Sequence, residues 1–489
     1  MGANFNLKTL TVALAALSAA SIASAAGLDR SGQDITAFLQ DGTYAETVYT
    51  YLDADVSGYD NAYIGKDKNA YQQGNKIDDI AESYDFFRYG VKADINDTFS
   101  VGVLYDEPFG AAADYSGDNN FVAQGDLDAS INAISGGVAS SVADASMKIG
   151  QLSQGAKQAG DLAASFAEQA QTATTPQAAA AFAAQAKAAK EQAQILAGQA
   201  RSLGGALKAA EAELATKGEG TNVEVRTENI TAILGMKFGE NKNFQIYGGP
   251  VAQQVQADVK LRGIAYSAAT GYTAHISSDQ DYGWLAGVSY SKPEIALQAA
   301  LTYRSEIDHT LPIFESYPAA SIEKAGDIDI TTPKSVNFDF QTGINPTTLA
   351  TAKVRWVPWS DFAIVPPVYT EVSKAQYPEG LSLVSYDKDQ WLVELGLAKR
   401  LTPALAVTGN IGWDSGAGNP VTSLGPIDGY YSAGLGAKYN FTENWAVSAG
   451  GKYLWFGDAK GQIPTKNVVS NFEDNDGFAL GVKLSYQAK

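Results

Sequence analysis

The sequence contains no cysteine and only two histidines, His275 and His309. The absence of cysteine excludes a disulfide-stapled secreted domain and a lipid-anchored lipoprotein. We interpret both histidine segments as loops and find no residues that complete a Ser-His-Asp or metal site, so we expect no enzyme, metal or cofactor. No later stretch reaches about 18 apolar residues, which excludes helical membrane spans. The formal net charge of −19 argues against a nucleic-acid partner.

One short apolar run does occur, at the N-terminus. Lys8 precedes an apolar stretch over residues 10–22, and the small residues Ala23, Ser24 and Ala25 follow it. This pattern predicts a secretory signal peptide over residues 1–25. The alternative, a membrane anchor, fits poorly because the run has about 13 residues and a span needs about 20.

The remaining chain, apart from one insert, alternates apolar and polar residues with period two, which is typical of strands. Aromatic residues stand at the ends of many apolar faces, as in the girdles of a transmembrane barrel, whereas a soluble sandwich would show the alternation without them. The last segment is the clearest example, with Phe478, Leu480, Val482, Leu484 and Tyr486 on one face and Ala479, Gly481, Lys483 and Ser485 on the other.

Short turns alternate with long connections along the chain. Short periplasmic turns and long outer loops are characteristic of bacterial barrels, and the segments between them number about fourteen, an even number. We therefore predict an all-β transmembrane protein, an antiparallel outer-membrane β-barrel over residues 45–126 and 218–489. The short turns, each with Asn, Pro, Asp or Glu chemistry, fall at residues 95–97, 240–243, 292–294, 345–347, 401–403 and 442–444.

Residues 127–217 interrupt this pattern with a segment rich in Ala, Gln and Lys. Two heptad tracts, starting at Ile131 and Phe182, predict an antiparallel, alanine-packed helical hairpin outside the cell. Thr175 followed by Pro176 predicts the start of the second helix. Each arm would reach roughly 60 Å at about 1.5 Å per residue. The alternative is a flexible loop, favoured by glycines such as Gly136 and Gly137.

Several stretches resemble the FadL-type family of outer-membrane transporters for long-chain fatty acids and other hydrophobic compounds. Residues 51–58 (YLDADVSG), 301–307 (LTYRSEI), 332–343 (TPKSVNFDFQTG) and 354–360 (VRWVPWS) carry the resemblance. The mature start resembles the family's inward-folded hatch, which we place at residues 26–44, but it lacks the family's Asn-Pro-Ala element. The chain also ends in Gln487, Ala488 and Lys489 rather than in an aromatic residue. The resembling start consists of Ala26, Gly27, Leu28, Asp29, Arg30, Ser31 and Gly32.

The resemblance implies that outer loops capture a hydrophobic molecule, that a lumen pocket holds it, and that a kinked strand releases it sideways. The gate candidate is Pro108 with Phe109 and Gly110, since proline removes a ladder hydrogen bond and a closed barrel has no edge to tolerate that loss. The alternative is a strand that simply ends at Asp106. The capture candidate is an apolar loop that could equally pack as a lid, made of Leu311, Pro312, Ile313 and Phe314.

If aromatic-rich faces point outward, the lumen receives many basic side chains, opposed by fewer carboxylates. Arginine suits bidentate contact with a carboxylate, so we expect Arg88, Arg304 or Arg355 to bind the head group of a hydrophobic acid. The alternative is that the charges pair across the lumen and hold the hatch through Asp29. The basic set is Arg88, Lys92, Arg304, Lys353, Arg355, Lys438, Lys452 and Lys483, and the opposing set is Asp106, Glu306, Asp339 and Glu394.

We therefore expect an outer-membrane channel of a Gram-negative bacterium that takes up fatty acids or similar hydrophobic molecules. Its expected partners are the substrate, outer-membrane lipid and lipopolysaccharide, and it is expected to act as a monomer. Two other classes stay open: a general aqueous porin, and a surface adhesin or receptor that displays the helical hairpin. An outer-membrane hydrolase is disfavoured because nothing in the sequence places a serine beside His275 or His309.

Overall fold

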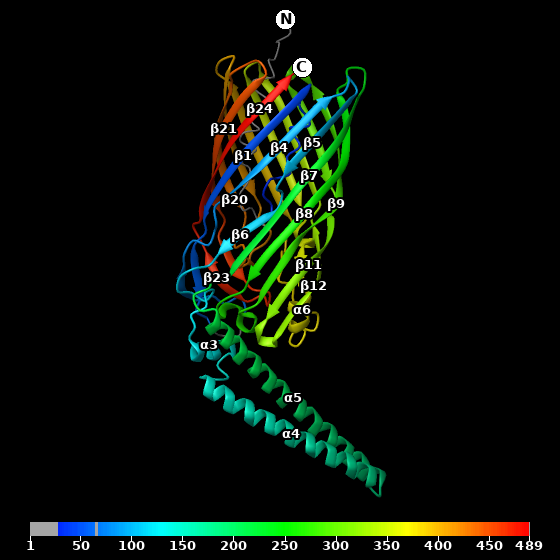
Figure 1. Cartoon of the computed structure of the whole chain (residues 1–489), viewed down its shortest axis with the longest axis vertical. Coiled ribbons are helices and arrows are strands. Elements are labelled where there is room, and N and C mark those ends of the chain that lie inside the picture. The colour runs from blue at the N-terminus through cyan, green and yellow to red at the C-terminus, as the bar shows by residue number, and fades with distance from the viewer. Residues whose placement is uncertain (1–27, 64–66, 489) are drawn as a thin grey trace.

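A closed antiparallel β-barrel forms most of the molecule, as seen in a computed structural model that describes residues 28–63 and 67–488 (Figure 1). The barrel wall consists of fourteen strands when β5 and β6, which are separated by an interruption, are counted as one strand. The barrel closes because β24 pairs with both β21 and β1. The strands are β1 (Thr43–Asp55), β4 (Tyr84–Asp94), β5 (Phe99–Asp106), β6 (Gly110–Asp114), β7 (Asn222–Phe238), β8 (Phe244–Lys260), β9 (Thr273–Lys292), β10 (Leu297–Arg304), β13 (Ser335–Asn345), β14 (Thr348–Val357), β17 (Gln390–Arg400), β18 (Leu405–Asp414), β20 (Tyr430–Asn440), β21 (Trp445–Phe456) and β24 (Asp476–Ala488).

Shorter elements occupy the outer end of the barrel, where the long loops lie. A hairpin continues the line of β10 and β13 outward, a five-stranded sheet forms from three loops, and small helices cover the mouth. The hairpin is β11 (Ile307–Tyr317) and β12 (Ile322–Thr332); the sheet is β2 (Gly58–Asn61), β3 (Gln73–Ile77), β19 (Val421–Thr422), β22 (Ala459–Gln462) and β23 (Val468–Phe472); β15 (Ala363–Ile364) pairs with β16 (Val384–Ser385); the helices are η1 (Ile264–Ala269), η3 (Pro318–Ala320), η4 (Trp359–Asp361) and α6 (Pro367–Ser373).

The short turns lie together at the opposite end, beside the C-terminus (Figure 1). β4 ends at Asp94 and β5 begins at Phe99, and the turns at residues 239–243, 293–296, 346–347, 401–404 and 441–444 join strands in the same way. One of them contains the 3₁₀ helix η2 (Pro293–Ile295). The sequence prediction of short turns at one end and long loops at the other is confirmed.

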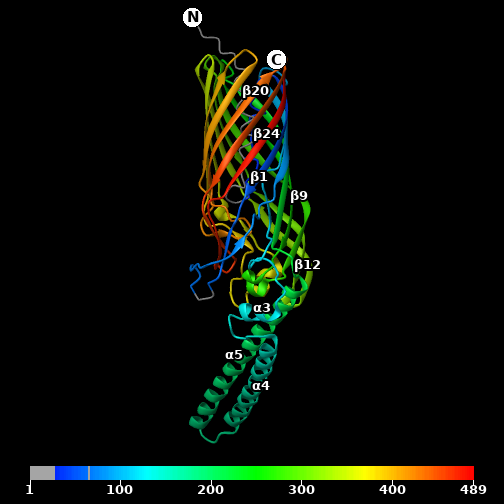
Figure 2. The same ribbon diagram turned by 90° about the vertical axis from the view of Figure 1, so that its left-hand side faces the viewer.

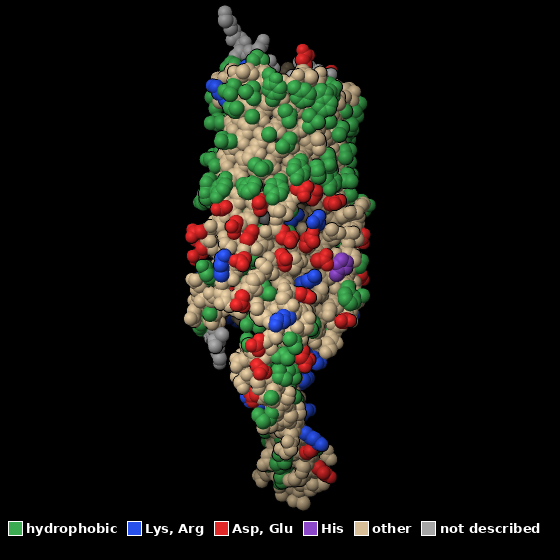
Figure 3. Space-filling model, turned by 60° about the vertical axis from the view of Figure 1, so that its left-hand side comes forward, with side chains coloured by type: hydrophobic (Ala, Val, Ile, Leu, Met, Phe, Trp, Pro, Cys, Tyr) green, Lys and Arg blue, Asp and Glu red, His purple; other side chains and the backbone are tan. Residues whose placement is uncertain are grey.

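An apolar belt surrounds the barrel near its turn end, and charged side chains cover the surface beyond it (Figure 3). In β24 the predicted apolar face is exposed at Leu480 and Val482, while Ala479 and Lys483 on the other face are buried. Leu435, at 74% exposure in the middle of β20, has the exposed tyrosines Tyr431 and Tyr439 on either side. An exposed apolar band with aromatic ends is the surface that a bilayer requires.

Beyond the belt the same strands reverse their polarity. In β8, Val255 and Val259 point inward and are buried, whereas Gln254, Gln256 and Asp258 point outward. The barrel wall therefore continues past the membrane, where water lies outside and packed side chains lie inside. Since one strand crosses both environments, its alternation stays in period while its apolar face changes side.

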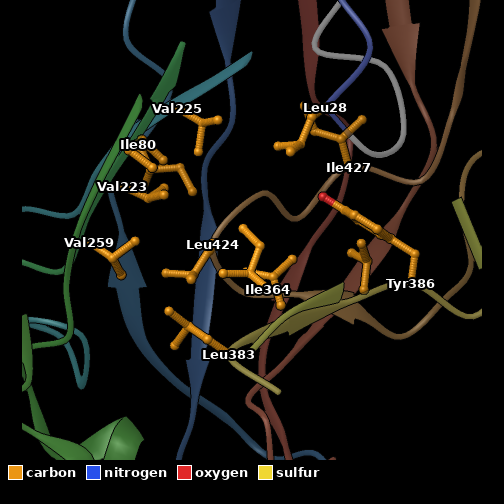
Figure 4. Close-up of a cluster of buried hydrophobic side chains, with 14 of the residues drawn as sticks. Leu28, Ile80, Val223, Val225, Val259, Ile364, Leu383, Tyr386, Leu424 and Ile427 are labelled. Carbon is orange, nitrogen blue, oxygen red and sulfur yellow. The ribbon is translucent and has the colours of Figure 1, made fainter. Parts of the chain in front are cut away.

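Apolar side chains fill the outer half of the lumen (Figure 4). Leu28 from the N-terminal segment lies close to Ile427, and Val223 of β7, Val259 of β8 and Ile364 of the small β15–β16 sheet face the same space. The N-terminal segment, residues 28–42, lies inside the barrel and is almost entirely buried. A segment folded into the lumen agrees with the predicted hatch, while Ala26, Gly27 and the predicted signal peptide lie outside the described residues.

A long helical hairpin projects from the outer end of the barrel between β6 and β7 (Figure 2). It consists of α4 (Val142–Thr172) and α5 (Pro176–Ala215), with the short α3 (Leu127–Ile134) at its base. Thr175 caps α5 as predicted, accepting a hydrogen bond from Ala178 N, and Pro176 is the first helical residue. With 31 and 40 residues, the arms are about 46 Å and about 60 Å long.

One part of the hairpin prediction is wrong. The heptad phase of the first arm was expected to continue through Gly136 and Gly137, but both glycines have positive φ and end α3. This conformation favours glycine and cannot continue a right-handed helix. The first arm therefore starts at Val142 with Ser141 as its N-cap. Among the described residues, no helix is both long enough and apolar enough to cross a membrane.

Candidate functional site

The wall of the barrel is interrupted where β5 gives way to β6. Pro108 lies between the two strands, and its missing N–H explains why the ladder cannot continue through it. The pairing of β4 with β5 runs from Asp94–Ser100 to Tyr89–Tyr105, and the next backbone pair between these chains is Ala81–Ala113. Within this window the Glu107 carboxylate, rather than a backbone carbonyl, accepts a hydrogen bond from Phe87 N.

The N-terminal segment closes this interruption from inside. Arg30 N donates a hydrogen bond to Pro108 O (2.7 Å), and Gly110 N donates to Leu28 O (2.7 Å). Asp29 and Phe109 form an antiparallel bridge. Gly110 leaves room for the Arg30 guanidinium, since a Cβ at this position would lie 2.3 Å from the guanidinium carbon and would displace that side chain. The hatch thus pairs with the kinked strand where a neighbouring strand would otherwise pair.

Phe109 points into the lumen rather than into the membrane. Its side chain is buried, and its ring meets the edge of Trp359 at 5.5 Å between centroids. Trp359 in turn packs on Phe362 and Tyr386 from the loop between β14 and β17. Any movement of the kinked strand is therefore coupled to the apolar packing of the outer lumen.

Two of the three predicted head-group arginines bind the protein's own carboxylates. Arg355 holds Asp29 through two hydrogen bonds, Nε to Oδ2 (2.6 Å) and Nη2 to Oδ1 (2.9 Å). Arg88 lies 3.0 Å from Asp34 and 3.1 Å from Glu46. Both pairs are buried, and paired buried charges are costly to separate. These arginines fix the hatch, which is the alternative that the sequence left open for them.

Arg304 is arranged differently. Its side chain is buried, and Nη1 donates to Thr231 Oγ1 at 3.3 Å, while Nε has no hydrogen-bond partner among the described residues. It lines a small pocket with Gln33 of the hatch, Asn229 of β7 and Gln253 of β8. Phe109 borders the same pocket, so the pocket lies next to the kinked strand.

The predicted capture loop is a strand, so that interpretation is wrong. Leu311 and Ile313 lie in β11 and are buried, while Phe314 points outward with 48% exposure. His309 also lies in β11 and His275 in β9, so neither histidine is on a loop. These strands extend beyond the membrane, where polar residues face outward, and a rule based on lipid-facing strands does not recognise them.

All eight basic residues assigned to the lumen are buried, as predicted, but the opposing set needs one correction. Asp106 and Glu394 are buried, whereas Glu306 is exposed and lies 3.4 Å from Lys334. Sequence reasoning missed Asp34 and Glu46, the carboxylates that hold Arg88. An available signal was the inward-facing position of Glu46 in β1, between Tyr44 and Val48. Within the part of the chain that the structure describes, no group of three or more His, Cys, Asp or Glu residues could hold a metal ion.

The architecture is that of a plugged outer-membrane barrel. No protein-family model and no curated protein sequence matches the chain. Among solved structures, it is similar to a Pseudomonas aeruginosa FadL homologue over 99% of both chains, with 13% identity and a TM-score of 0.58. It is also similar to a TodX deltaS2S3 mutant, a monoaromatic hydrocarbon channel, over 97% of this chain and 98% of that chain (11% identity, TM-score 0.53).

A further likeness is to the P. putida toluene transporter TodX, over 92% of this chain and 91% of that chain, with 11% identity and a TM-score of 0.50. What these proteins share with the chain is the fold. The chain therefore has the fold of FadL-type outer-membrane channels, and its apolar belt is that of a barrel that crosses the outer membrane many times.

Proposed function

We propose that this protein takes up hydrophobic small molecules across the outer membrane and releases them sideways through the wall at Pro108. The observation that carries the proposal is the interrupted β5–β6 wall, closed from inside by hatch residues Leu28–Arg30 rather than by a strand. A plug that pairs with the wall can leave it by exchanging a few hydrogen bonds. The solved structures with this fold include a FadL homologue and channels for monoaromatic hydrocarbons and toluene, which supports the same class of substrate.

The apolar filling of the outer lumen supports a hydrophobic substrate rather than a hydrated one. The apolar cluster in the outer lumen, which includes Leu28 and Ile427, would exclude water from the entrance (Figure 4). A general porin requires a water-filled passage, and both this cluster and the hatch oppose it. Capture is assigned to the outer mouth, where the exposed Phe314 gives an apolar contact, while Leu311 and Ile313 line the route inside.

We propose a hydrophobic carboxylic acid, such as a long-chain fatty acid, as the substrate. Arg304 is the head-group residue because, unlike Arg88 and Arg355, it forms no salt bridge with a described carboxylate, and its unpartnered Nε borders the pocket beside the kinked strand. Arg88 and Arg355 bind a head group only if the hatch moves, since Asp34, Glu46 and Asp29 occupy them. The channel acts as a monomer surrounded by outer-membrane lipid and lipopolysaccharide.

The substitution Pro108→Val tests the release route. Valine restores the backbone N–H and favours the extended conformation, so β5 can pair further with β4 and close the window. We expect slower uptake of palmitate by cells in which this barrel is the only fatty-acid channel. Gly110 is left unchanged, because a side chain there would displace Arg30 and disturb the hatch as well.

Pro250→Val is the matched control. Pro250 also interrupts pairing, between β7 and β8, but the hatch does not bond to the wall there. Uptake should be unchanged in this variant. Undiminished uptake in Pro108→Val, with normal folding judged by heat-modifiable gel mobility, contradicts the proposed route.

A second function, display of a surface-binding element, is favoured by one observation. The α4–α5 hairpin projects far beyond the barrel mouth and takes no part in closing it (Figure 2). In that case the hairpin would bind a partner while the barrel anchors it.

A further inference from the structure

A second interruption of the wall lies three strands away from the first, between β9 and β11. Leu285 pairs with Arg304, and Ile276 pairs with Ile313, so the register is the same on both sides of the interruption. The residues in contact across it, Gly283 with Ile307 and Asp281 with His309, are offset from that register by one residue. Among the described residues, no ladder pair joins residues 277–283 to residues 306–312, although both segments are extended. This unpaired seam is roughly 23 Å long at about 3.3 Å per residue.

Three local features explain why the ladder fails there. β9 carries a register shift opposite Val255 and Ala257 of β8, which turns the strand. Pro312 lacks the N–H that a ladder needs at the outer end of the seam. At the inner end, Pro333 lies between β12 and β13, so the strand on the far side of β11 is interrupted next to the Ile307–Thr332 pair. Several features of the sequence, rather than the loss of one contact, therefore leave the seam unpaired.

Side-chain contacts close most of the seam. At its inner end one backbone hydrogen bond remains, from Ser305 N to Trp284 O (2.9 Å), while Trp284 N donates to the Ser305 hydroxyl at 3.0 Å, where a ladder would use a carbonyl. A Cβ on Gly283 would lie 2.6 Å from Ile307 Cγ1, so the isoleucine side chain occupies the space that a larger residue would need. Further out, His309 Nδ1 lies 3.4 Å from Asp281 Oδ2. Side-chain contacts of this kind can separate by rotamer changes without moving the strands apart along their length.

A polar pocket lies directly behind the seam. Gln253 is its centre: Nε2 donates to Asn229 Oδ1 (2.9 Å), and Oε1 accepts from Thr332 Oγ1 (2.6 Å) and lies 2.9 Å from His309 Nε2. Two donors that border the pocket, Asn229 Nδ2 and Arg304 Nε, are buried and have no hydrogen-bond partner among the described residues. Buried donors of this kind are normally satisfied, so they provide binding partners for an acceptor group. The pocket volume is only about 10 Å³, so a carboxylate reaches these donors only when the seam opens.

Exposed aromatic side chains lie on the outer surface of the barrel at the membrane end of the seam. Tyr282 is 69% exposed and Trp284 is 51% exposed, and the Trp284 ring lies 5.2 Å from that of Tyr303. Tyrosine and tryptophan favour the boundary between lipid tails and head groups. The seam therefore starts at the level of the outer interface and extends outward from it, with an apolar mouth and a polar pocket behind.

We propose that the unpaired seam between β9 and β11 is a second lateral opening of the barrel, used by amphiphiles with a carboxylate head group. The head group binds the free donors of Arg304 and Asn229, and the hydrocarbon tail passes between Gly283 and Ile307 toward the lipid at Tyr282 and Trp284. This inference rests on the proposed uptake function and adds a separate route to it, which a small apolar molecule without a head group does not require.

The absence of cysteine from the chain allows a direct test. Asp279→Cys with Thr310→Cys places two exposed thiols across the seam at the continued register, and a short bifunctional thiol reagent then joins them. The control pair is Val288→Cys with Leu301→Cys, two exposed residues that face each other in the paired part of β9 and β10. Both pairs are placed in the Pro108→Val background, so that the first opening is already closed.

We expect cross-linking of the seam to abolish the palmitate uptake that remains in Pro108→Val, and expect the control cross-link to leave it unchanged. Residual uptake that survives a complete seam cross-link, verified by mass spectrometry, overturns the second opening while the proposed function stands. If the wild-type protein does not take up palmitate at all, the proposed function and this inference both fail.

Discussion

Individual buried charges divide into two groups in this barrel, those that hold the hatch and those that remain available. Arg355 and Arg88 form salt bridges with Asp29, Asp34 and Glu46, whereas Arg304 forms none with a described carboxylate and its Nε has no hydrogen-bond partner. Burial of an unsatisfied donor costs about 1–3 kcal/mol, so a ligand that accepts from it recovers that energy. The position of an arginine on an inward-facing strand residue is predictable from alternation, but its partner is not, because the partner comes from a distant segment.

Arg304→Met should weaken the handling of carboxylates specifically. The loss of a charge-assisted hydrogen bond of about 1.5–3 kcal/mol corresponds to at least a roughly tenfold higher half-saturating palmitate concentration. Toluene has no acceptor group, and its uptake should not change. Concentration-dependent uptake of both compounds by the variant checks this expectation. Arg304→Lys retains the charge and should recover part of the loss; equal effects on palmitate and toluene would indicate a structural role instead.

Glu213 near the end of α5 gives the base of the hairpin a pH dependence. Its carboxylate accepts hydrogen bonds from Gln124 N (3.2 Å) and Thr270 Oγ1 (2.8 Å), and burial raises its pKa above the ordinary value. A raised folded-state pKa means that the ionised form destabilises docking at higher pH, and that this cost disappears as the pH falls through the folded pKa. The base of α5 should therefore be more firmly docked in mildly acidic solution.

Hydrogen-exchange protection of residues 203–216, corrected for intrinsic rates, should be higher at about pH 5 than at about pH 8. Glu213→Gln should remove that difference, because the amide does not ionise. Glu211→Gln, an exposed glutamate on the same helix, serves as the control and should keep it. The same pH difference in Glu213→Gln as in the unmodified protein would show that another group is responsible.

Among the elements, β11 shows most clearly what the sequence could and could not reveal. Its buried residues include Ile307, His309, Leu311 and Ile313, and the residues between them face outward. The alternation was visible, but polar residues such as Asp308 and Thr310 face outward because this strand lies beyond the membrane. Pro312 also suggested a loop. A pattern rule needs to know which solvent each face meets, and only the position of β11 on top of β10 supplies that.

The break at Pro108 was predictable because a single residue causes it, through the missing N–H. The seam between β9 and β11 was not, since it depends on a bulge in β8–β9 pairing, on Pro312 in β11 and on Pro333 between β12 and β13. The caps of α5 were equally local: Thr175 and Pro176 define the start of the helix by their own chemistry. Elements fixed by adjacent residues were predicted; those fixed by three strands meeting in space were not.

The hairpin is expected to be dispensable for uptake. Its base packs on the barrel loops through α3 and the end of α5, with Ile131, Leu203 and Ala210 in one cluster, but the distal part contacts only itself. Replacing residues 153–198 with a short Gly-Ser turn should leave the palmitate uptake rate unchanged. Loss of binding to whole cells or a surface ligand, with uptake intact, would assign the hairpin a display function; loss of uptake contradicts its separation from the channel.

At the scale of the whole molecule, two solvents divide the barrel into a membrane half and an outer half. The membrane half presents its apolar side chains outward, and the outer half packs most of its apolar side chains inward (Figures 3 and 4). Fourteen strands were predictable from turns and alternation, and so was the even number. The division into halves was not predicted, because the length of the strands beyond the membrane follows from loops that pair with one another.

Leu435→Lys tests the membrane half. Leu435 lies midway along the lipid-exposed face of β20 with 74% exposure, and a lysine near the bilayer midplane costs about 2–4 kcal/mol. Reversible urea unfolding in lipid vesicles should show a decrease of that size. Ser448→Lys is the control, because it adds the same charge at a buried position that faces the lumen. Its effect on the free energy of unfolding should reflect packing in the lumen and should not depend on the thickness of the lipid bilayer.

The equal register at the two ends of the seam has a mechanical consequence. Because Leu285–Arg304 and Ile276–Ile313 share one offset, the paired segments beyond the seam keep their alignment when the residues between them join or part. The wall can therefore open over this length while the stagger of the strands around the barrel stays the same. Since stagger and strand number together fix the diameter of a barrel, this side exit can operate while the cylinder around it keeps its width.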